Sequence, residues 1–287
     1  MSHVLSAAEL SELIATEPRL RLLDVRWRLD RPDGRADHLA GHIAGAVYVD
    51  LDGELAAPGD PSLGRHPLPA SADLQDAARR WGVNAGDVVV AYDDVRGIAA
   101  ARAWWLLRQA GVDVKILDGG LRAWTAAGHV LESGTVTPTP GDIELAEIGA
   151  DALSIDEAAV LPASGILIDV RAPERYRGES EPLDPAAGHI PGAVNVPTGE
   201  LFAADGLLLG QDALRRRFAD AGVTEDTPVA AYCGSGIAAT HTALVLSEIG
   251  IEAAVFPGSW SQWSRTDGRP VATGARPQGG VAEAVHA

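Results

Sequence analysis

The sequence predicts an α/β protein with two similar domains, each built on a mainly parallel sheet with helices on both faces. Two observations support this fold class. Short apolar runs alternate with helical patterns, which is typical of parallel strands joined by helices. The chain also repeats itself: LLDVRWRLD at 22–30 matches LIDVRAPER at 167–175, and GHIAGAVYVDLDGEL at 41–55 matches GHIPGAVNVPTGEL at 188–201. The matching blocks follow one order in both halves, so we infer a duplicated domain.

The first half contains four short apolar runs that predict buried strands and one longer apolar run that predicts a helix. The helix stops at Gly111, because glycine commonly ends helices. The predicted strands are Leu20–Asp24, Ala46–Val49, Val88–Tyr92 and Val114–Leu117, and the predicted helix is Ala99–Gln109. Three tryptophans, Trp104, Trp105 and Trp124, are expected to pack in a core or between domains.

The repeats set the domain boundaries. We predict a first domain over residues 1–135, a linker over 136–152, a second domain over 153–272 and a C-terminal tail over 273–287. The linker carries glycine and proline without a clear period, which favours irregular structure. The tail, rich in Gly, Ala and Pro, is expected to be loosely held and to carry no chemistry.

Composition favours a soluble protein that acts on a small molecule. The 287 residues are 46% hydrophobic and 22% charged, which is enough to build two full cores. The single cysteine excludes an internal disulfide and fits a reducing, cytoplasmic setting. A formal net charge of −17 argues against nucleic acid and anionic membranes as partners, but not against a small anionic substrate. Neither a signal peptide nor a membrane span is expected.

Cys233 is the candidate nucleophile. It follows the apolar run 228–232 and opens the turn Cys233-Gly234-Ser235-Gly236, after which small residues predict a helix from Ile237. The two glycines allow successive N–H groups to point at one spot, and the helix end adds partial positive charge. A lone cysteine is more often a small core residue. The glycine-rich turn nevertheless favours a catalytic thiolate here.

The matching turn of the first half carries Asp93 in place of Cys233, because AYDD at 91–94 aligns with AYCG at 231–234. An aspartate cannot form a persulfide. The first domain is therefore predicted to be non-catalytic and to form one wall of the active-site cleft. We interpret Asp93 itself as a turn or helix-cap residue.

Taken together, these motifs resemble the two-domain rhodanese family of sulfurtransferases. The resemblance runs from about residue 22 to residue 270 and rests on the DVR and GHIPGAVN blocks, YCGSGIAA at 232–239 and the PGSW…W ending at 257–263. It implies tandem rhodanese-like domains and transfer of a sulfane sulfur through a Cys233 persulfide. The Cys-Gly-Ser-Gly loop is similar to that of the 3-mercaptopyruvate sulfurtransferases, whereas thiosulfate-preferring members carry Arg and Lys after the cysteine.

The resemblance implies a small anionic sulfur donor, with 3-mercaptopyruvate favoured over thiosulfate, and a thiol or cyanide acceptor. The thiol acceptor could be a low-molecular-weight thiol or a thioredoxin-like protein. Two alternatives remain open: a thiosulfate:cyanide sulfurtransferase, and a persulfide carrier or partner-binding protein with little turnover.

The family also implies roles for residues around the cysteine. Ser235 would be oriented in a hydroxyl relay by His42 and by Asp33, with Asp37 as a competitor for the third place. The alternative for His42 is a structural role in the turn before Ala46. The amides of the loop and of the first helical turn would hold the persulfide anion; these residues are Gly234, Gly236, Ile237 and Ala238.

Arg175 matches the arginine that the family uses to hold the donor carboxylate, a role that suits its bidentate guanidinium. Members that use 3-mercaptopyruvate carry a second arginine in a Glu-Pro-Arg stretch. Here the stretch is EPLD at 181–184, so that arginine is missing. Arg26, Arg31 and Arg177 are candidates to compensate, although each alone is more simply a solvated surface residue.

Other classes fit less well. The related phosphatases need an arginine six positions after the cysteine, and residue 239 is alanine, so phosphoryl transfer would lack its main charge stabiliser. No metal site is expected, because the eight histidines do not cluster with a second cysteine or at ligand spacing. No cofactor is expected either, since a nucleotide-binding glycine fingerprint is absent.

Overall fold

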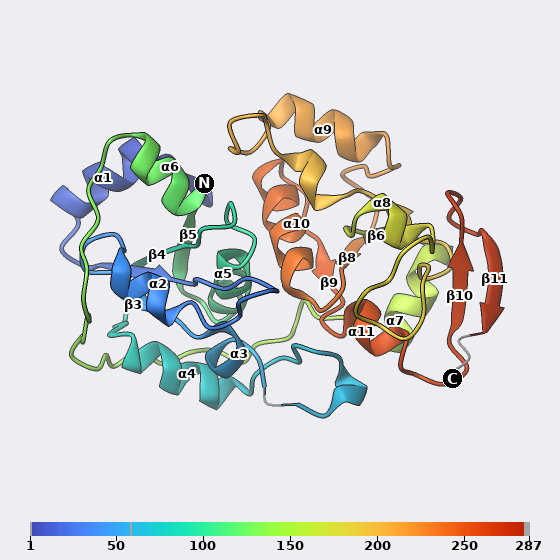
Figure 1. Cartoon of the computed structure of the whole chain (residues 1–287), viewed down its shortest axis with the longest axis horizontal. Helices are drawn as coiled ribbons and strands as arrows, with labels where there is room; N and C mark the ends of the chain where they lie inside the picture. The colour runs from blue at the N-terminus through green and yellow to red at the C-terminus, as the bar shows by residue number, and fades with distance from the viewer. Residues whose placement is uncertain (1, 58, 284–287) are drawn as a thin grey trace. The chain divides into compact units, whose positions relative to one another are not determined.

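The computed structural model describes residues 2–57 and 59–283, which divide into two compact units (Figure 1). Among these residues, unit 1 comprises 2–57, 68–150 and 204–208, and unit 2 comprises 59–67, 151–203 and 209–283. The units follow the predicted halves except for two short segments. Residues 59–67 cluster with the second half, and residues 204–208 cluster with the first, where the Leu208 amide donates to Asp118 Oδ1 at 3.1 Å.

Unit 1 is built on a five-stranded parallel sheet with the order β1-β5-β4-β2-β3. The four predicted strands are all present, with Ala46–Val49 shortened to two residues, and β1 adds a strand that the sequence analysis did not predict. The strands are β1 (Val4–Leu5), β2 (Leu20–Asp24), β3 (Val47–Tyr48), β4 (Val88–Tyr92) and β5 (Asp113–Leu117).

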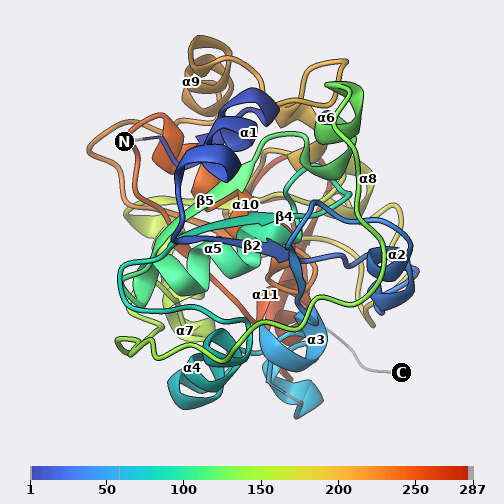
Figure 2. The ribbon, with the colours of Figure 1, turned by 90° about the vertical axis from the view of Figure 1, so that its left-hand side faces the viewer.

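Helices cover both faces of this sheet (Figure 2). On one face, Leu10 of α1 and Trp124 of α6 share a core with Leu22 of β2 and Val90 of β4. Side chains alternate along a strand, so the neighbouring residue Val89 points to the opposite face, beside α5. The helices are α1 (Ala7–Thr16), α2 (Arg35–Ala40), α3 (Leu51–Glu54), α4 (Ser71–Arg80), α5 (Ala100–Gln109) and α6 (Gly120–Ala126).

Unit 2 repeats this plan with a four-stranded parallel sheet of order β7-β6-β8-β9. The fifth strand is reduced to a single parallel bridge between Ala152 and Val255, which corresponds to the pairing of β1 with β5. The strands are β6 (Ile166–Asp169), β7 (Val194–Asn195), β8 (Val229–Tyr232) and β9 (Ala254–Val255). The α-helices are α7 (Ile155–Val160), α8 (Pro173–Tyr176), α9 (Gln211–Ala219), α10 (Ile237–Glu248) and α11 (Ser259–Trp263). Unit 2 also contains the 3-10 helices η1 (Pro61–Leu63), η2 (Leu161–Ala163) and η3 (Thr198–Leu201).

The repeated sequence blocks make the same contacts in both units. In unit 2, Arg171 pairs with Asp169 at 2.6 Å and donates to the carbonyl of Gly188. Arg26, Asp24 and Gly41 make the equivalent contacts in unit 1. A buried guanidinium with both partners in place joins the end of β2, or of β6 in unit 2, to the GHI turn, which explains why the DVR and GHI blocks recur together.

The segments outside the sheets are partly ordered. Residues 136–150 of the predicted linker run along unit 1, where the Gly141 amide donates to the carbonyl of Arg79 at 2.7 Å. The expectation of a loosely held tail is wrong for its described part. There, β10 (Pro270–Thr273) pairs antiparallel with β11 (Gly280–Glu283), because the turn between them lets both backbones satisfy each other's hydrogen bonds. Residues 284–287 lie outside the described chain.

Within the part of the chain that the structure describes, no helix is long and apolar enough to cross a membrane.

Candidate active site

Cys233 lies at the carboxyl end of β8 and its thiol is enclosed by its own turn. The residue is only 4% exposed, and the Gly236 amide donates to Sγ at 3.1 Å. Gly236 precedes α10 with a φ of +84°, and a Cβ there would lie 2.3 Å from the carbonyl oxygen of Pro257. Both the backbone angle and the close approach require glycine. The bond from the Gly236 amide to Sγ is the kind of contact that the predicted anion-holding role of this turn requires.

The N-terminus of α11 makes several hydrogen bonds to the same turn. Ser259 Oγ accepts the Cys233 amide at 3.1 Å and donates to the carbonyl of Phe256 at 2.9 Å. The Trp260 and Ser261 amides donate to the carbonyls of Cys233 and Gly234 at 3.0 and 2.9 Å. These bonds fix the backbone that carries the nucleophile.

Ser259 is a site residue that the sequence analysis missed. It is fully buried, its Oγ lies 4.0 Å from Cys233 Sγ, and its φ of +53° is unusual for a residue with a side chain. Backbone strain of this kind persists where surrounding contacts hold it. The sequence analysis marked only the PGSW…W block at 257–263 and gave Ser259 no role.

The other predicted residues of the loop follow Cys233 in the turn and in the first turn of α10. Gly234, Ser235 and Ile237 are buried and Ala238 is half-buried. The first amides of α10 have no acceptor within the helix, so they are available to an anion. The turn and the helix end can thus hold a negative charge on a sulfur atom attached to Cys233.

Arg175 lies beside this loop. It projects from α8 and its Nη1 is 3.5 Å from the position that a Cβ would take on Gly234. Its other side binds Glu181, through Nε at 3.1 Å and Nη2 at 2.6 Å. Glu181 therefore fixes the guanidinium with one amino group directed at the loop.

The three arginines considered as compensating cations are all engaged elsewhere. Arg26 is buried against Asp24, Arg31 pairs with Asp37 at 2.6 Å, and Arg177 pairs with Glu179 at 2.7 Å. A different residue, Arg65, lies over the loop, with Nη2 3.0 Å from the Cβ position of Gly234. Sequence reasoning missed Arg65 because its ion-pair partner, Asp184, is 119 positions away along the chain.

In the equivalent loop of unit 1, the side chain of Asp93 accepts the hydrogen bonds of the backbone amides. Asp93 is fully buried, and its carboxylate accepts the amides of Val95, Gly97, Ala99 and Ala100 at 2.7–2.9 Å. Burial raises the pKa of Asp93 to about 6, and the four amides oppose that rise. The interpretation of Asp93 as a turn and cap residue agrees with these contacts, and the loop holds an internal anion where Cys233 stands in unit 2.

The two relay residues predicted from the first half lie in unit 1 without contacting each other. His42 is fully buried, stacks on His38 with ring centroids 4.1 Å apart, and has Nδ1 at 2.7 Å from the carbonyl oxygen of His38. Asp33 accepts the Arg35 amide and the Tyr48 hydroxyl instead. The aspartate that binds a histidine in this region is Asp24, 2.8 Å from His38 Nδ1. The relay of Ser235, His42 and Asp33 stays a prediction.

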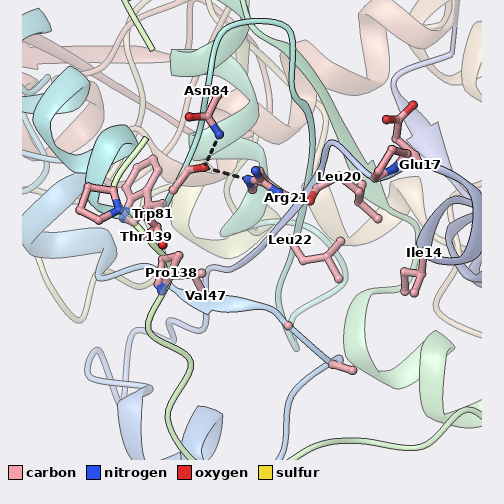
Figure 3. Close-up of a pocket in the computed structure, with 15 residues that line it drawn as sticks. Ile14, Glu17, Leu20, Arg21, Leu22, Val47, Trp81, Asn84, Pro138 and Thr139 are labelled. Carbon is pink, nitrogen blue, oxygen red and sulfur yellow. Dashed lines mark hydrogen bonds between the residues drawn. The ribbon is translucent and has the colours of Figure 1, made fainter. Parts of the chain in front are cut away.

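Unit 1 also contains a cavity of about 590 Å³, lined by residues of β2, the end of α4 and the segment 138–140 (Figure 3). Its polar side chains satisfy groups of the cavity wall: Arg21 and Asn84 both donate to the carbonyl of Gly82, at 2.7 and 3.2 Å. The cavity has no cysteine or other strong nucleophile in its lining. It does not compete with the Cys233 loop as a reactive site.

Comparisons with known proteins agree with the class that the fold and loop define, a duplicated α/β protein with one cysteine in an anion-holding turn. The chain belongs to the rhodanese family, since the model of the rhodanese-like domain matches residues 6–127 and 152–266. It is 46% identical over 275 residues to SseB of Mycobacterium tuberculosis, provisionally named a thiosulfate sulfurtransferase, covering 94% of this chain and 97% of that one.

Two further relatives are named for 3-mercaptopyruvate. A protein of Pseudomonas aeruginosa, provisionally named a 3-mercaptopyruvate sulfurtransferase, is 41% identical over 286 residues, covering 95% of this chain and 99% of the relative. The crystal structure of SseA from Escherichia coli, described as a 3-mercaptopyruvate sulfotransferase with the rhodanese fold, matches with a TM-score of 0.78 and 32% identity. That match covers 91% of this chain and 99% of SseA.

Proposed function

We propose that this protein transfers a sulfane sulfur from 3-mercaptopyruvate, through a persulfide on Cys233, to a thiol or cyanide. The observation that carries the proposal is the Cys233 turn, in which Sγ accepts a backbone amide beneath the N-terminus of α10 while Arg175 lies over Gly234. The turn suits a sulfur anion and the arginine suits a carboxylate.

In the first half-reaction, the Cys233 thiolate attacks the donor sulfur. A new S–S bond forms while the C–S bond of the donor breaks, and its electron pair leaves with the carbon as the enolate of pyruvate, which takes up a proton. The Gly236 amide and the free amides of α10 hold the charge of the thiolate before attack and of the persulfide after it. The backbone at Cys233 and Gly234 is held by Ser259 and α11, so little reorganisation of the turn accompanies the reaction.

In the second half-reaction, an acceptor thiolate attacks the outer sulfur of the persulfide. The S–S bond breaks, its electron pair returns to Cys233 Sγ, and the acceptor leaves as a persulfide. A low-molecular-weight thiol or a thioredoxin-like protein is the proposed acceptor, and cyanide can take the sulfur as thiocyanate. A free thiolate at Cys233 needs a reducing compartment, so we place the reaction in the cytoplasm.

Thiosulfate is the second candidate donor. It is favoured by the two guanidinium groups, of Arg65 and Arg175, that lie over Gly234 in place of the charged loop residues of thiosulfate-using members. A dianion would be held by these two cations together. The name of the Mycobacterium tuberculosis relative points the same way.

Turnover with 3-mercaptopyruvate and with thiosulfate, measured side by side on the purified protein with Cys233→Ser as the blank, tests the proposal. We expect a clear preference for 3-mercaptopyruvate, measured as kcat/KM. A preference for thiosulfate would show that thiosulfate, and not 3-mercaptopyruvate, is the sulfur donor. If neither donor turned over but Cys233 gained one sulfur atom by mass, the protein would be a persulfide carrier.

A further inference from the structure

Arg65 reaches the Cys233 loop on a segment that comes from the first half of the chain but folds with unit 2. In the described part of this segment, residues 59–67, Gly64 has a φ of +96°, and a Cβ there would lie 2.7 Å from the carbonyl oxygen of Gly258. The Arg65 amide donates to Ser261 Oγ at 3.1 Å. The segment is thus fastened to α11, the same helix that braces the nucleophile.

The side chain of Arg65 is held by a buried carboxylate. Asp184 is the acceptor of a hydrogen bond from Arg65 Nη1, and it also binds Arg265 at 2.6 Å. Arg175 Nη2 lies 3.7 Å from the same carboxylate. Three guanidinium groups therefore share Asp184, whose side chain has no exposed surface.

Two of these arginines keep one amino group directed at the nucleophile loop. Arg65 Nη2 and Arg175 Nη1 are the nitrogens closest to the Cβ position of Gly234, at 3.0 and 3.5 Å. Neither nitrogen has a hydrogen-bond acceptor among the residues that the structure describes. Both side chains are partly open to solvent, with 25% and 18% of their surface exposed, so a small anion can reach them.

The positive charge around the loop exceeds what the local carboxylates neutralise. Arg65, Arg175 and Arg265 face Asp184, and Glu181 already binds Arg171 at 3.2 Å as well as Arg175. Two carboxylates thus share the arginines of this cluster. An anion placed between Arg65 Nη2 and Arg175 Nη1 would use the remaining donors of both guanidinium forks.

We propose that Arg65 is the second cation of the donor site and that it binds, together with Arg175, the carboxylate of a small sulfur donor whose sulfur is attacked by Cys233. Leu183 stands where related sulfurtransferases carry an arginine. The neighbouring Asp184 binds the guanidinium of Arg65, which supplies the second positive charge in place of that arginine. Asp184 is accordingly a positioning residue, and the assignment rests on the proposed function in that it takes the donor to be an anion.

Alkylation of Cys233 tests this assignment without any sulfur donor. Iodoacetate and iodoacetamide have nearly the same shape, but only iodoacetate carries a carboxylate. In both reactions Sγ attacks the CH₂ carbon, a C–S bond forms, and iodide leaves with the electron pair of the C–I bond. Because the chain has one cysteine, the rate can be followed by the mass of the intact protein.

We expect Arg65→Gln to slow alkylation by iodoacetate roughly ten- to a hundredfold, the loss of one charged hydrogen bond, while leaving the iodoacetamide rate within about twofold. Arg177→Gln, which removes an arginine paired with Glu179, is the matched control and should change neither rate. Arg65→Gln should fold, because Asp184 keeps Arg265 as a partner. Equal slowing of both reagents by Arg65→Gln, or no slowing of either, would overturn the assignment.

Asp184→Asn is the second variant. As a positioning residue, Asp184 should affect iodoacetate selectively and leave iodoacetamide unchanged; a purely structural role would slow both reagents alike. With 3-mercaptopyruvate, Arg65→Gln should raise KM more than it lowers kcat. If the wild-type protein failed to turn over this donor, the proposed function would fall, whereas the iodoacetate selectivity would still decide the role of Arg65.

Discussion

The Gly236 amide donates to Cys233 Sγ at 3.1 Å, so the turn that follows the nucleophile folds back to hold its sulfur. The equivalent loop in unit 1 makes the same kind of bond to a different side chain, since the Gly97 amide donates to Asp93 Oδ1 at 2.7 Å. The same turn geometry therefore has different roles in the two units. In unit 1 the turn binds a buried carboxylate that has a structural role, and in unit 2 it binds the sulfur of the candidate nucleophile.

Gly236→Ala should abolish most activity and destabilise the protein, because a Cβ would lie 2.3 Å from the carbonyl oxygen of Pro257 at a φ of +84°. Gly250 has the same φ of +84° but nothing within 4 Å of its Cβ position, so Gly250→Ala is the matched control. We expect about 1–2 kcal/mol of destabilisation for Gly250→Ala, from backbone strain alone, and more for Gly236→Ala. Urea unfolding and single-turnover assays measure both effects; equal losses in the two variants would show that the close approach to Pro257 is unimportant.

Ser259→Ala should slow persulfide formation and lower the free energy of unfolding by about 1–3 kcal/mol, because the buried Cys233 amide loses its acceptor. Ser259→Gly loses the same hydroxyl but relieves the φ of +53°, so it should be the more stable of the two. Both variants should share the slower persulfide formation. A normal rate in either one contradicts the role of Oγ in fixing the nucleophile.

The stability of the protein should fall as pH rises through the titration of Asp93. Burial raises the pKa of Asp93 to about 6, above that of an unfolded aspartate, so the native state binds this proton more tightly. Its contribution to stability is fully present below about pH 4 and is lost as pH rises through about 6, for a change of about 3 kcal/mol. Urea unfolding across this range, with Asp93→Asn as reference, isolates the effect: the wild-type advantage over the variant should decrease with rising pH. A constant or increasing advantage would contradict it.

Arg175→Gln should raise the KM for 3-mercaptopyruvate roughly ten- to a hundredfold, since one charged contact to the carboxylate is lost. The variant should also lose some stability, because Glu181 is left with Arg171 as its arginine partner. Steady-state kinetics with Arg177→Gln as control separates the two effects. An unchanged KM in Arg175→Gln would place the carboxylate elsewhere.

Much of the fold could be predicted because the chain is duplicated, so each sequence block that marks a strand or a turn occurs in both halves. The DVR and GHI blocks recur because Arg26 and Arg171 each bind a glycine carbonyl near the end of a strand, and such contacts between nearby residues produce recognisable sequence motifs. The two-residue strand β1 has no such motif, since it depends on pairing with β5, more than 100 residues further along the chain. The tail hairpin was missed because its Gly- and Pro-rich composition also describes a disordered end.

The residues alone predicted the part of the candidate site that is continuous in sequence, and the family resemblance added Arg175. Cys233, Gly234 and Gly236 form one turn, and their chemistry follows from glycine content and the helix that begins there. Arg65 and Ser259 depend on tertiary contacts, with Asp184 and with the amide of Cys233. No local pattern marks such residues, so the sequence analysis considered Arg26, Arg31 and Arg177 as compensating cations and did not consider Arg65.

The mass of the intact protein after brief exposure to 3-mercaptopyruvate, compared with that of Cys233→Ser, tests whether Cys233 carries the sulfur. The wild-type protein should gain one sulfur atom on Cys233, release an equal amount of pyruvate and return to its original mass when a thiol is added. The Cys233→Ser variant should stay folded and gain nothing. Pyruvate release by the variant at the wild-type rate, or sulfur attached anywhere other than Cys233, would contradict the central claim.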